Sequence, residues 1–223
     1  MSIHMQRHMD KVKRMLFTLA GDVEHSLSRA VQAVESRDAR LAKEVLDEDD
    51  KIDAAEIEIE EECLYALALE QPRAMDLRFV VAVLKMNNDL ERIGDLASNI
   101  AQQAIHLSKG VRIELSEFLP GMAPEVLNML RGALDALLQM DVEQADAVRS
   151  ADDRVDEIHK NCFRLVENSI RADPVNCGAY ISVLTISRNL ERAADLATNI
   201  AEDVIYLVRG EIQRHKSDLV EPQ

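Results

Sequence analysis

The sequence has few of the residues that strands, turns and stacking surfaces need. Its 223 residues include no tryptophan, only 3% aromatic residues, seven glycines and five prolines. An all-β sandwich or barrel depends on many turn residues and on β-branched or aromatic strands, so this class is excluded. Hydrophobic residues nevertheless make up 47% of the chain, too large a share for an intrinsically disordered protein. The composition therefore indicates a folded, mainly helical protein.

Basic residues are scarce relative to acidic ones. The chain has 26 Lys and Arg against 41 Asp and Glu, which gives a formal net charge of −15 at pH 7. A protein that binds nucleic acid without sequence preference needs a positive surface and commonly uses aromatic residues for stacking. This chain lacks both features, so we expect no nucleic-acid partner.

The cysteines and the hydropathy pattern indicate the cellular compartment in which the protein is found. Cys63, Cys162 and Cys177 are an odd number without a CxxC pair, so no disulfide or zinc-ribbon framework is expected and a reducing environment fits. No apolar run reaches the roughly 20 residues of a transmembrane helix. The first residues do not follow the pattern of a signal peptide. We therefore expect a cytoplasmic protein with no transmembrane segment.

Prolines divide the chain into long segments rich in Ala, Leu, Glu, Lys and Arg, which are strong helix formers. Proline would break such helices, and Pro72 and Pro174 lie between segments. Asp38 is suited to cap the helix that follows it, and Pro120-Gly121 indicates a turn within the one long linker. The sequence predicts six helices, at about residues 6–36, 38–69, 75–108, 124–140, 142–171 and 174–210.

The chain also contains an internal duplication. Residues 89–101 match residues 189–201, and residues 38–53 match residues 141–156. The two offsets differ by three residues, and the difference falls in the connection between the second and third helix of each half. The sequence therefore predicts an all-α fold of two tandem three-helix bundles. The predicted repeats are residues 1–110 and 111–223, with a linker at about 111–124.

Oxygen-bearing side chains recur at helical spacing in both halves. Residues four apart lie on the same face of a helix, so each half has one such stripe on its second helix and another on its third. The stripes of the third helices are Glu91, Asp95 and Asn99, and Glu191, Asp195, Asn199 and Glu202; those of the second helices are Asp49, Asp53, Glu56 and Glu60, and Asp152, Asp156 and His159.

Two interpretations of these stripes stay open. Acidic proteins commonly expose a solvated, charged helix face. Like charges four residues apart, however, repel by roughly a few tenths of a kcal/mol per pair, and no lysine or arginine is expected on the same arc. Because the stripes recur in both halves, a bound cation that neutralises them is the second interpretation. Carboxylate and amide oxygens suit cations such as Fe, Mn, Mg and Ca.

A carboxylate-bridged metalloenzyme or a metal-storage bundle is a further alternative. The Glu-x-x-His pairs of ferritin-like di-iron proteins are absent. The sequence also has no nucleophile elbow, glycine-rich phosphate loop or HExxH helix. No catalytic residues are therefore predicted, and we expect a protein that is not an enzyme.

Four motifs resemble those of a known family. They are residues 49–56 (DDKIDAAE), 71–78 (QPRAMDLR) and 90–100 (LERIGDLASNI), and the second-half copy at 190–202 (LERAADLATNIAE). In this combination the chain resembles the PhoU family over nearly its whole length. The second copy has Ala193-Ala194 where family members carry Ile-Gly. The motif at 71–78 has no clear copy in the second half.

The resemblance implies a function that the spacing alone does not. PhoU-like proteins are cytoplasmic negative regulators of phosphate uptake and of the phosphate-starvation response. The resemblance implies contacts with the ATPase subunit of the phosphate ABC transporter, which would place the chain at the inner membrane, and with a phosphate-sensing histidine kinase. It also implies a homodimer. The acidic motifs are implied to bind divalent or trivalent metal ions, including iron clusters, with Zn, Mn and Mg as alternatives.

Overall fold

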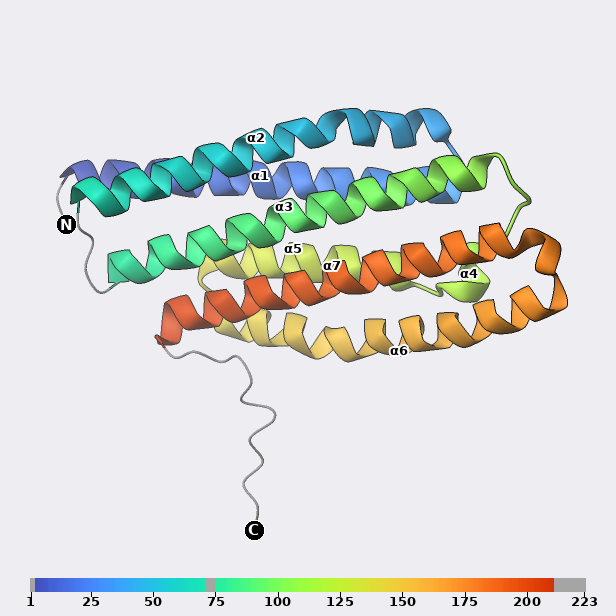
Figure 1. Cartoon of the computed structure of the whole chain (residues 1–223). Helices are drawn as coiled ribbons and strands as arrows, with labels where there is room; N and C mark the ends of the chain where they lie inside the picture. The colour runs from blue at the N-terminus through green and yellow to red at the C-terminus, as the bar shows by residue number, and fades with distance from the viewer. Residues whose placement is uncertain (1–2, 71–74, 211–223) are drawn as a thin grey trace, which may run out of the picture.

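The computed structural model describes residues 3–70 and 75–210, and every regular element in these two ranges is helical (Figure 1). The prediction of an all-α protein is confirmed. The elements are α1 (Ile3–Ser36), α2 (Ala39–Glu70), α3 (Met75–Ser108), α4 (Leu115–Phe118), α5 (Met122–Gln139), α6 (Val142–Ala172), the 3-10 turn η1 (Pro174–Asn176) and α7 (Cys177–Arg209).

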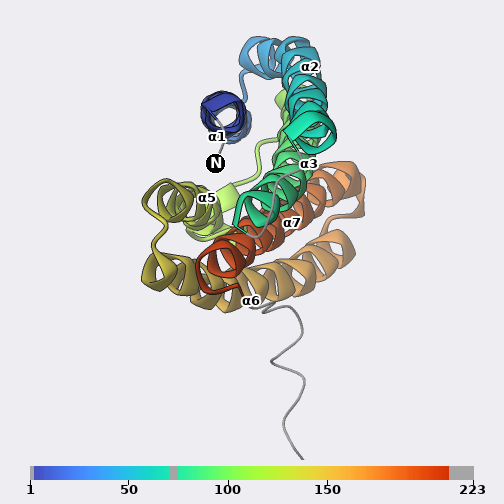
Figure 2. The same cartoon turned by 90° about the vertical axis from the view of Figure 1, so that its left-hand side faces the viewer.

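Two sets of three long helices lie side by side. Helices α1, α2 and α3 pack on one another, and α5, α6 and α7 form the second set. Helices α3 and α7 run antiparallel and join the two sets, and α1 also contacts α5 (Figure 2). The predicted pair of tandem three-helix bundles is thus confirmed. The boundary between the repeats, set at residues 110 and 111, stays a prediction.

One hydrophobic core continues from the first bundle into the second. It includes Leu16 and Leu19 of α1, Leu90 of α3, Leu130 of α5 and Leu190 of α7, each at most 1% exposed. Each of these helices presents an apolar stripe to the interior, and burial of apolar surface contributes about 25 cal/mol per Å². Because the bundles share this core, separating them would expose apolar surface on both.

The linker contains a helical turn that the sequence pattern did not predict. Helix α4 places Phe118 in a small second core with Cys162 and Val166 of α6 and Val183 of α7. The ring of Phe118 also lies 6.0 Å from the ring of Tyr180, centroid to centroid. A four-residue helix has too few hydrogen bonds to be stable by itself. Its packing on the second bundle therefore accounts for it.

The second helix of each bundle begins in the same way. The Oδ1 atom of Asp38 accepts the backbone N–H groups of the second and third residues after it, at 2.9 and 3.0 Å. The Oδ1 atom of Asp141 accepts the corresponding groups at 2.9 and 3.1 Å. Such a cap satisfies donors that have no partner within the helix. The predicted N-cap at Asp38 is confirmed, and its copy at Asp141 agrees with the duplication.

Candidate functional site

A close contact between α2 and α3 sets the position of the acidic residues in the first bundle. A β-carbon added at Gly94 would lie 3.1 Å from Cγ2 of Ile52, so the two helices approach closely at this glycine. Gly94 lies between Glu91 and Asp95 on α3, and Ile52 precedes Asp53 on α2. The two acidic stripes therefore run along the same side of the α2–α3 contact.

The carboxylates of the first bundle influence one another. Burial raises the pKa of Asp49, and the charges of Asp53 and Asp95 raise it further, while the nearby Ser98 hydroxyl acts in the opposite direction. Burial also raises the pKa of Glu91, with added contributions from Asp95 and Asp53. The Oδ1 atom of Asp49 is buried and has no hydrogen-bond partner within residues 3–70 and 75–210. The stripes of α2 and α3 thus face each other.

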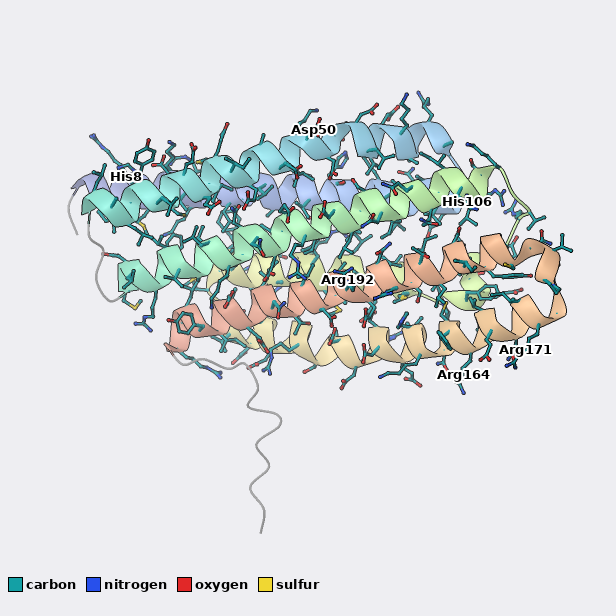
Figure 3. All side chains as sticks on the ribbon, viewed as in Figure 1. His8, Asp50, His106, Arg164, Arg171 and Arg192 are labelled. Carbon is teal, nitrogen blue, oxygen red and sulfur yellow. The ribbon has the colours of Figure 1, made fainter. Side chains whose placement is uncertain are left out.

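The second bundle repeats this arrangement with stronger effects. Burial raises the pKa of Asp152 to about 6, and the charges of Asp195, Asp156 and Glu191 add to the shift. Burial likewise raises the pKa of Asp195 to about 6, with contributions from Glu191 and Asp156 that Arg192 partly opposes. Arg192 lies near the middle of α7 (Figure 3). The acidic cluster of the second bundle, formed by Asp152, Asp156, Glu191 and Asp195, therefore lies midway along that bundle.

Basic side chains reach the second cluster, although none was expected on the same arc. The Nζ atom of Lys160 lies 3.0 Å from Oδ2 of Asp156, one turn away on α6. The Nε atom of Arg149 lies 3.6 Å from Oε1 of Glu202 on α7. The expectation was wrong for this half because Lys160 lies four residues after Asp156 on the same face of α6, and because the long Arg149 side chain reaches across to α7. Glu202 is consequently part of an ion pair.

A histidine distinguishes the second cluster from the first. By the duplication, His159 corresponds to Glu56. The Nδ1 atom of His159 lies 2.8 Å from Oγ of Ser187, which is fully buried. In the first bundle the corresponding residue, Asn87, donates instead from Nδ2 to the backbone oxygen of Glu56 at 2.9 Å. The helical spacing of the acidic residues did not single out positions 87 and 187. Their polar side chains, one turn before Glu91 and Glu191, were the available signal.

The carboxylate and amide oxygens of each bundle suit a hard cation, although these side chains do not converge on one point. Within the described ranges, no group of three or more His, Cys, Asp or Glu side chains is placed so that it could hold a metal ion. Asn99 is exposed and Asn199 is partly buried at the far end of each stripe. Mutually repelling carboxylates and the unpartnered Asp49 Oδ1 atom are nevertheless the groups that a cation would stabilise. Metal binding at these residues stays a prediction.

Comparison with known proteins identifies the family. The model of the PhoU domain matches the chain twice, at residues 16–104 and 119–204. The chain belongs to the PhoU family. The chain is 34% identical over 209 residues to the phosphate-specific transport system accessory protein PhoU homolog 1 of Thermotoga maritima, covering 93% of this chain and 90% of that protein.

Two solved PhoU structures share the fold. The crystal structure of PhoU from Pseudomonas aeruginosa has a TM-score of 0.89 and 37% identity, and covers 92% of this chain and 99% of that one. The phosphate transport system regulatory protein PhoU from Streptococcus pneumoniae has a TM-score of 0.85 and 27% identity, and covers 93% of this chain and 98% of that one. The predicted family resemblance is therefore confirmed, and the two matched segments agree with the predicted duplication.

The structure covers the PhoU motifs in part. Residues 71–74 of the motif at 71–78 lie outside the described residues, and the remainder forms the first turn of α3. The second copy has Ala193-Ala194 where family members carry Ile-Gly, and the position on the neighbouring helix that corresponds to Ile52 holds a smaller side chain. Gly94 lies against Ile52, whereas Ala194 is paired by the duplication with the smaller Val155.

In residues 3–70 and 75–210, no helix is long and apolar enough to cross a membrane.

Replacement of Gly94 with alanine is expected to lower the free energy of unfolding by about 1 kcal/mol. The added methyl group would overpack Ile52 at a cost of about 2 kcal/mol, and the higher helix propensity of alanine offsets about 1 kcal/mol of this. The double variant Gly94→Ala, Ile52→Val copies the pairing of the second bundle and removes Cδ1 of Ile52, which lies 3.2 Å from the added β-carbon, so it should recover part of the stability that Gly94→Ala loses. Urea denaturation of the three proteins measures both effects. A double variant no more stable than Gly94→Ala would contradict the steric explanation.

The metal-free protein is expected to lose stability as the pH rises from about 4 to about 6, because of Asp152 and Asp195. Their pKa values are about 6 in the folded state against 3.8 for an unperturbed aspartate. The folded state thus holds these protons more tightly, and its advantage is lost as they dissociate. Asp195→Asn should raise the free energy of unfolding at pH 7 by about 1 kcal/mol after screening by solvent is considered.

Denaturation curves at pH 4, 5, 6 and 7 in the presence of a chelator test this expectation. Asp47→Asn, at an exposed position of α2, is the control for the loss of one negative charge. The explanation fails if Asp195→Asn gains no more stability at pH 7 than this control.

Proposed function

We propose that this chain is a metal-binding accessory regulator of phosphate transport, which represses phosphate uptake and the phosphate-starvation response through protein contacts. The relative from Thermotoga maritima is named an accessory protein of a phosphate-specific transport system. The match to the PhoU domain in both halves is the observation that carries the proposal. The names of the relatives also support a role without catalysis.

The proposed partners are the ATPase subunit of the phosphate ABC transporter and a phosphate-sensing histidine kinase. The chain would act in the cytoplasm, as a homodimer, and reach the inner membrane through the transporter. Residues 38–70 hold thirteen acidic and three basic residues, a net charge of −10. A surface of this charge favours association with positively charged partner surfaces and disfavours nucleic acid.

The proposed metal ligands are the facing carboxylates of each bundle. Divalent or trivalent ions such as iron, or Zn, Mn or Mg, would reduce the repulsion within each cluster and hold two neighbouring helices together. In the second bundle the Ser187 contact occupies Nδ1 of His159 and leaves Nε2 as the nitrogen that can ligate. The proposed ligands are Asp49, Asp53, Glu91, Asp95 and Asn99 in the first bundle, and Asp152, Asp156, Glu191, Asp195, Asn199 and Glu202 in the second.

Replacement of Glu91, Asp95, Glu191 and Asp195 together by alanine is expected to abolish bound metal. These four side chains supply facing carboxylates in both bundles, whereas the helices depend on the apolar core. Far-UV circular dichroism should therefore change little. Elemental analysis after exposure to Fe, Zn, Mn or Mg measures the stoichiometry.

The control removes four acids from exposed positions elsewhere, namely Glu58, Glu61, Glu143 and Glu157. It has the same net charge as the alanine variant and should keep the native metal content. Equal metal content in the two variants would overturn the proposed sites. Redox or hydrolytic turnover by the metal-loaded native protein would favour the metalloenzyme alternative.

A pull-down from extracts of cells grown at high and low phosphate tests the regulatory role. Recovery of the transporter ATPase subunit or of a sensor kinase, in amounts that depend on phosphate, is the expected result. If neither the ATPase subunit nor a sensor kinase is recovered at high or at low phosphate, the proposed contacts are contradicted. Size-exclusion chromatography with light scattering tests the homodimer.

A further inference from the structure

A cavity of about 270 Å³ lies where the two bundles and the linker meet. The C-terminal end of α1 and the linker form one side of it, and α3, α5 and α7 form the rest. Ile100 and Leu190 of its wall adjoin Asn99 and Glu191 of the acidic stripes in sequence, but consecutive residues of a helix lie about 100° apart around its axis. Representative wall residues are Val34 of α1, Ile100 of α3, Leu119 of the linker, Ala123 of α5, and Ile186 and Leu190 of α7.

The inner wall of this cavity is apolar. Ile100, Ile186 and Leu190 line it and are at most 2% exposed. An apolar cavity of about 150 Å³ stays dry and admits a molecule of the size of benzene. A cavity of 270 Å³ therefore has room for a longer hydrocarbon chain or for two small rings. Filling it would restore van der Waals contacts that its lining now lacks.

The charges at the cavity favour an anionic head group. Arg37 lines the wall and is partly buried, and its guanidinium group donates to the backbone oxygens of Leu107, Gly110 and Val111 at 2.5 to 2.9 Å. Within residues 3–70 and 75–210, Arg37 forms no ion pair with a carboxylate. The wall acids Glu35 and Glu114 are exposed, so water screens them more effectively than it screens Arg37. Glu114 also pairs with Arg112 of the same wall, whose Nε atom lies 3.1 Å from its Oε1 atom.

We propose that this cavity binds a single-chain amphiphile with an anionic head group, of which a medium-chain carboxylate is the simplest member. The hydrocarbon chain contacts the apolar wall, and the carboxylate lies near Arg37. Both bundles and the linker contribute to the wall, so the ligand contacts all three at once. Occupancy therefore stabilises one arrangement of the two bundles.

Fluorescence quenching tests the site directly, because the chain has no tryptophan. The variant Phe118→Trp places a reporter beside the wall residues of the linker, and Phe163→Trp places a matched reporter on the exposed face of α6. Bromodecanoate, kept below its micelle concentration, should quench the first and leave the second nearly unchanged. Equal quenching of both reporters would show non-specific association and overturn the proposal.

A cavity-filling variant and a series of head groups complete the test. Ala123→Phe occupies part of the cavity and should weaken decanoate binding by at least about tenfold in calorimetric titration. Ala172→Phe, at an exposed position, should not weaken it. Val34→Phe replaces Ala123→Phe if that variant does not fold.

Decanoate, decanol and decylamine share one chain length and differ in head-group charge. Decanoate should bind more tightly than decylamine, with decanol between them. Binding of decylamine as tightly as decanoate would overturn the anionic specificity, and no binding of any of the three would overturn the site.

Discussion

Replacement of Lys85 with methionine is expected to lower the free energy of unfolding by about 3 kcal/mol. The Nζ atom of Lys85 on α3 lies 3.1 Å from Oδ1 of Asp203 on α7, and the Asp203 side chain is only 3% exposed. Loss of the ammonium group removes a charged partner from this buried carboxylate, and removing one side of a buried ion pair typically costs about 3–5 kcal/mol. The lower end applies because the Lys85 side chain is 39% exposed. The midpoint and slope of urea denaturation measure the effect.

The duplication supplies a matched control for this prediction. Positions 185 and 103 correspond to 85 and 203, and they hold Thr185 and Gln103. The double variant Lys85→Thr, Asp203→Gln therefore introduces an uncharged pair from the related position of the same interface. It should lose less than half of the stability that Lys85→Met loses. If the double variant is as unstable as the single one, lost packing explains the effect better than the buried charge does.

Replacement of Leu90 with alanine is expected to lower the free energy of unfolding by about 3 kcal/mol and to weaken both bundles. Leu90 is 1% exposed, and removal of three buried carbon atoms loses transfer free energy and leaves a cavity. Because the core continues across α3 and α7, the two bundles should unfold in one cooperative transition. Calorimetry measures the stability and the cooperativity.

Amide hydrogen exchange locates the effect along the chain. Protection of the most stable amides should fall by the same free energy in α1–α3 and in α5–α7. Leu138→Ala is the control, because Leu138 on α5 is 63% exposed and its loss should change stability by less than about 0.5 kcal/mol. A loss of protection confined to α1–α3 would show that the bundles unfold independently.

Local patterns were sufficient to predict the helices and the paired acidic stripes. The spacing of four residues places Glu91 and Asp95 on one face of a helix in any tertiary setting. The copies of residues 38–53 and 89–101 in the other half revealed the two bundles. Asp38 was recognisable as a cap because its hydrogen bonds reach only two and three residues along the chain.

Contacts between distant segments could not be predicted in the same way. Helix α4 depends on the packing of Phe118 against α6 and α7. The ion pair between Arg149 of α6 and Glu202 of α7 depends on how these two helices pack. Lys85 and Asp203 are 118 residues apart, and no local pattern pairs them.

The sequence by itself determined the elements and the chemistry that each helix face carries, because helical periodicity and capping act over a few neighbouring residues. Only the tertiary structure decided how α3 docks on α7, which charges are buried there, and where the cavity at Arg37 forms. Those features arise from the packing of surfaces whose parts lie far apart in the chain. Their free energy comes from burial and charge pairing, which exist only once the bundles are assembled.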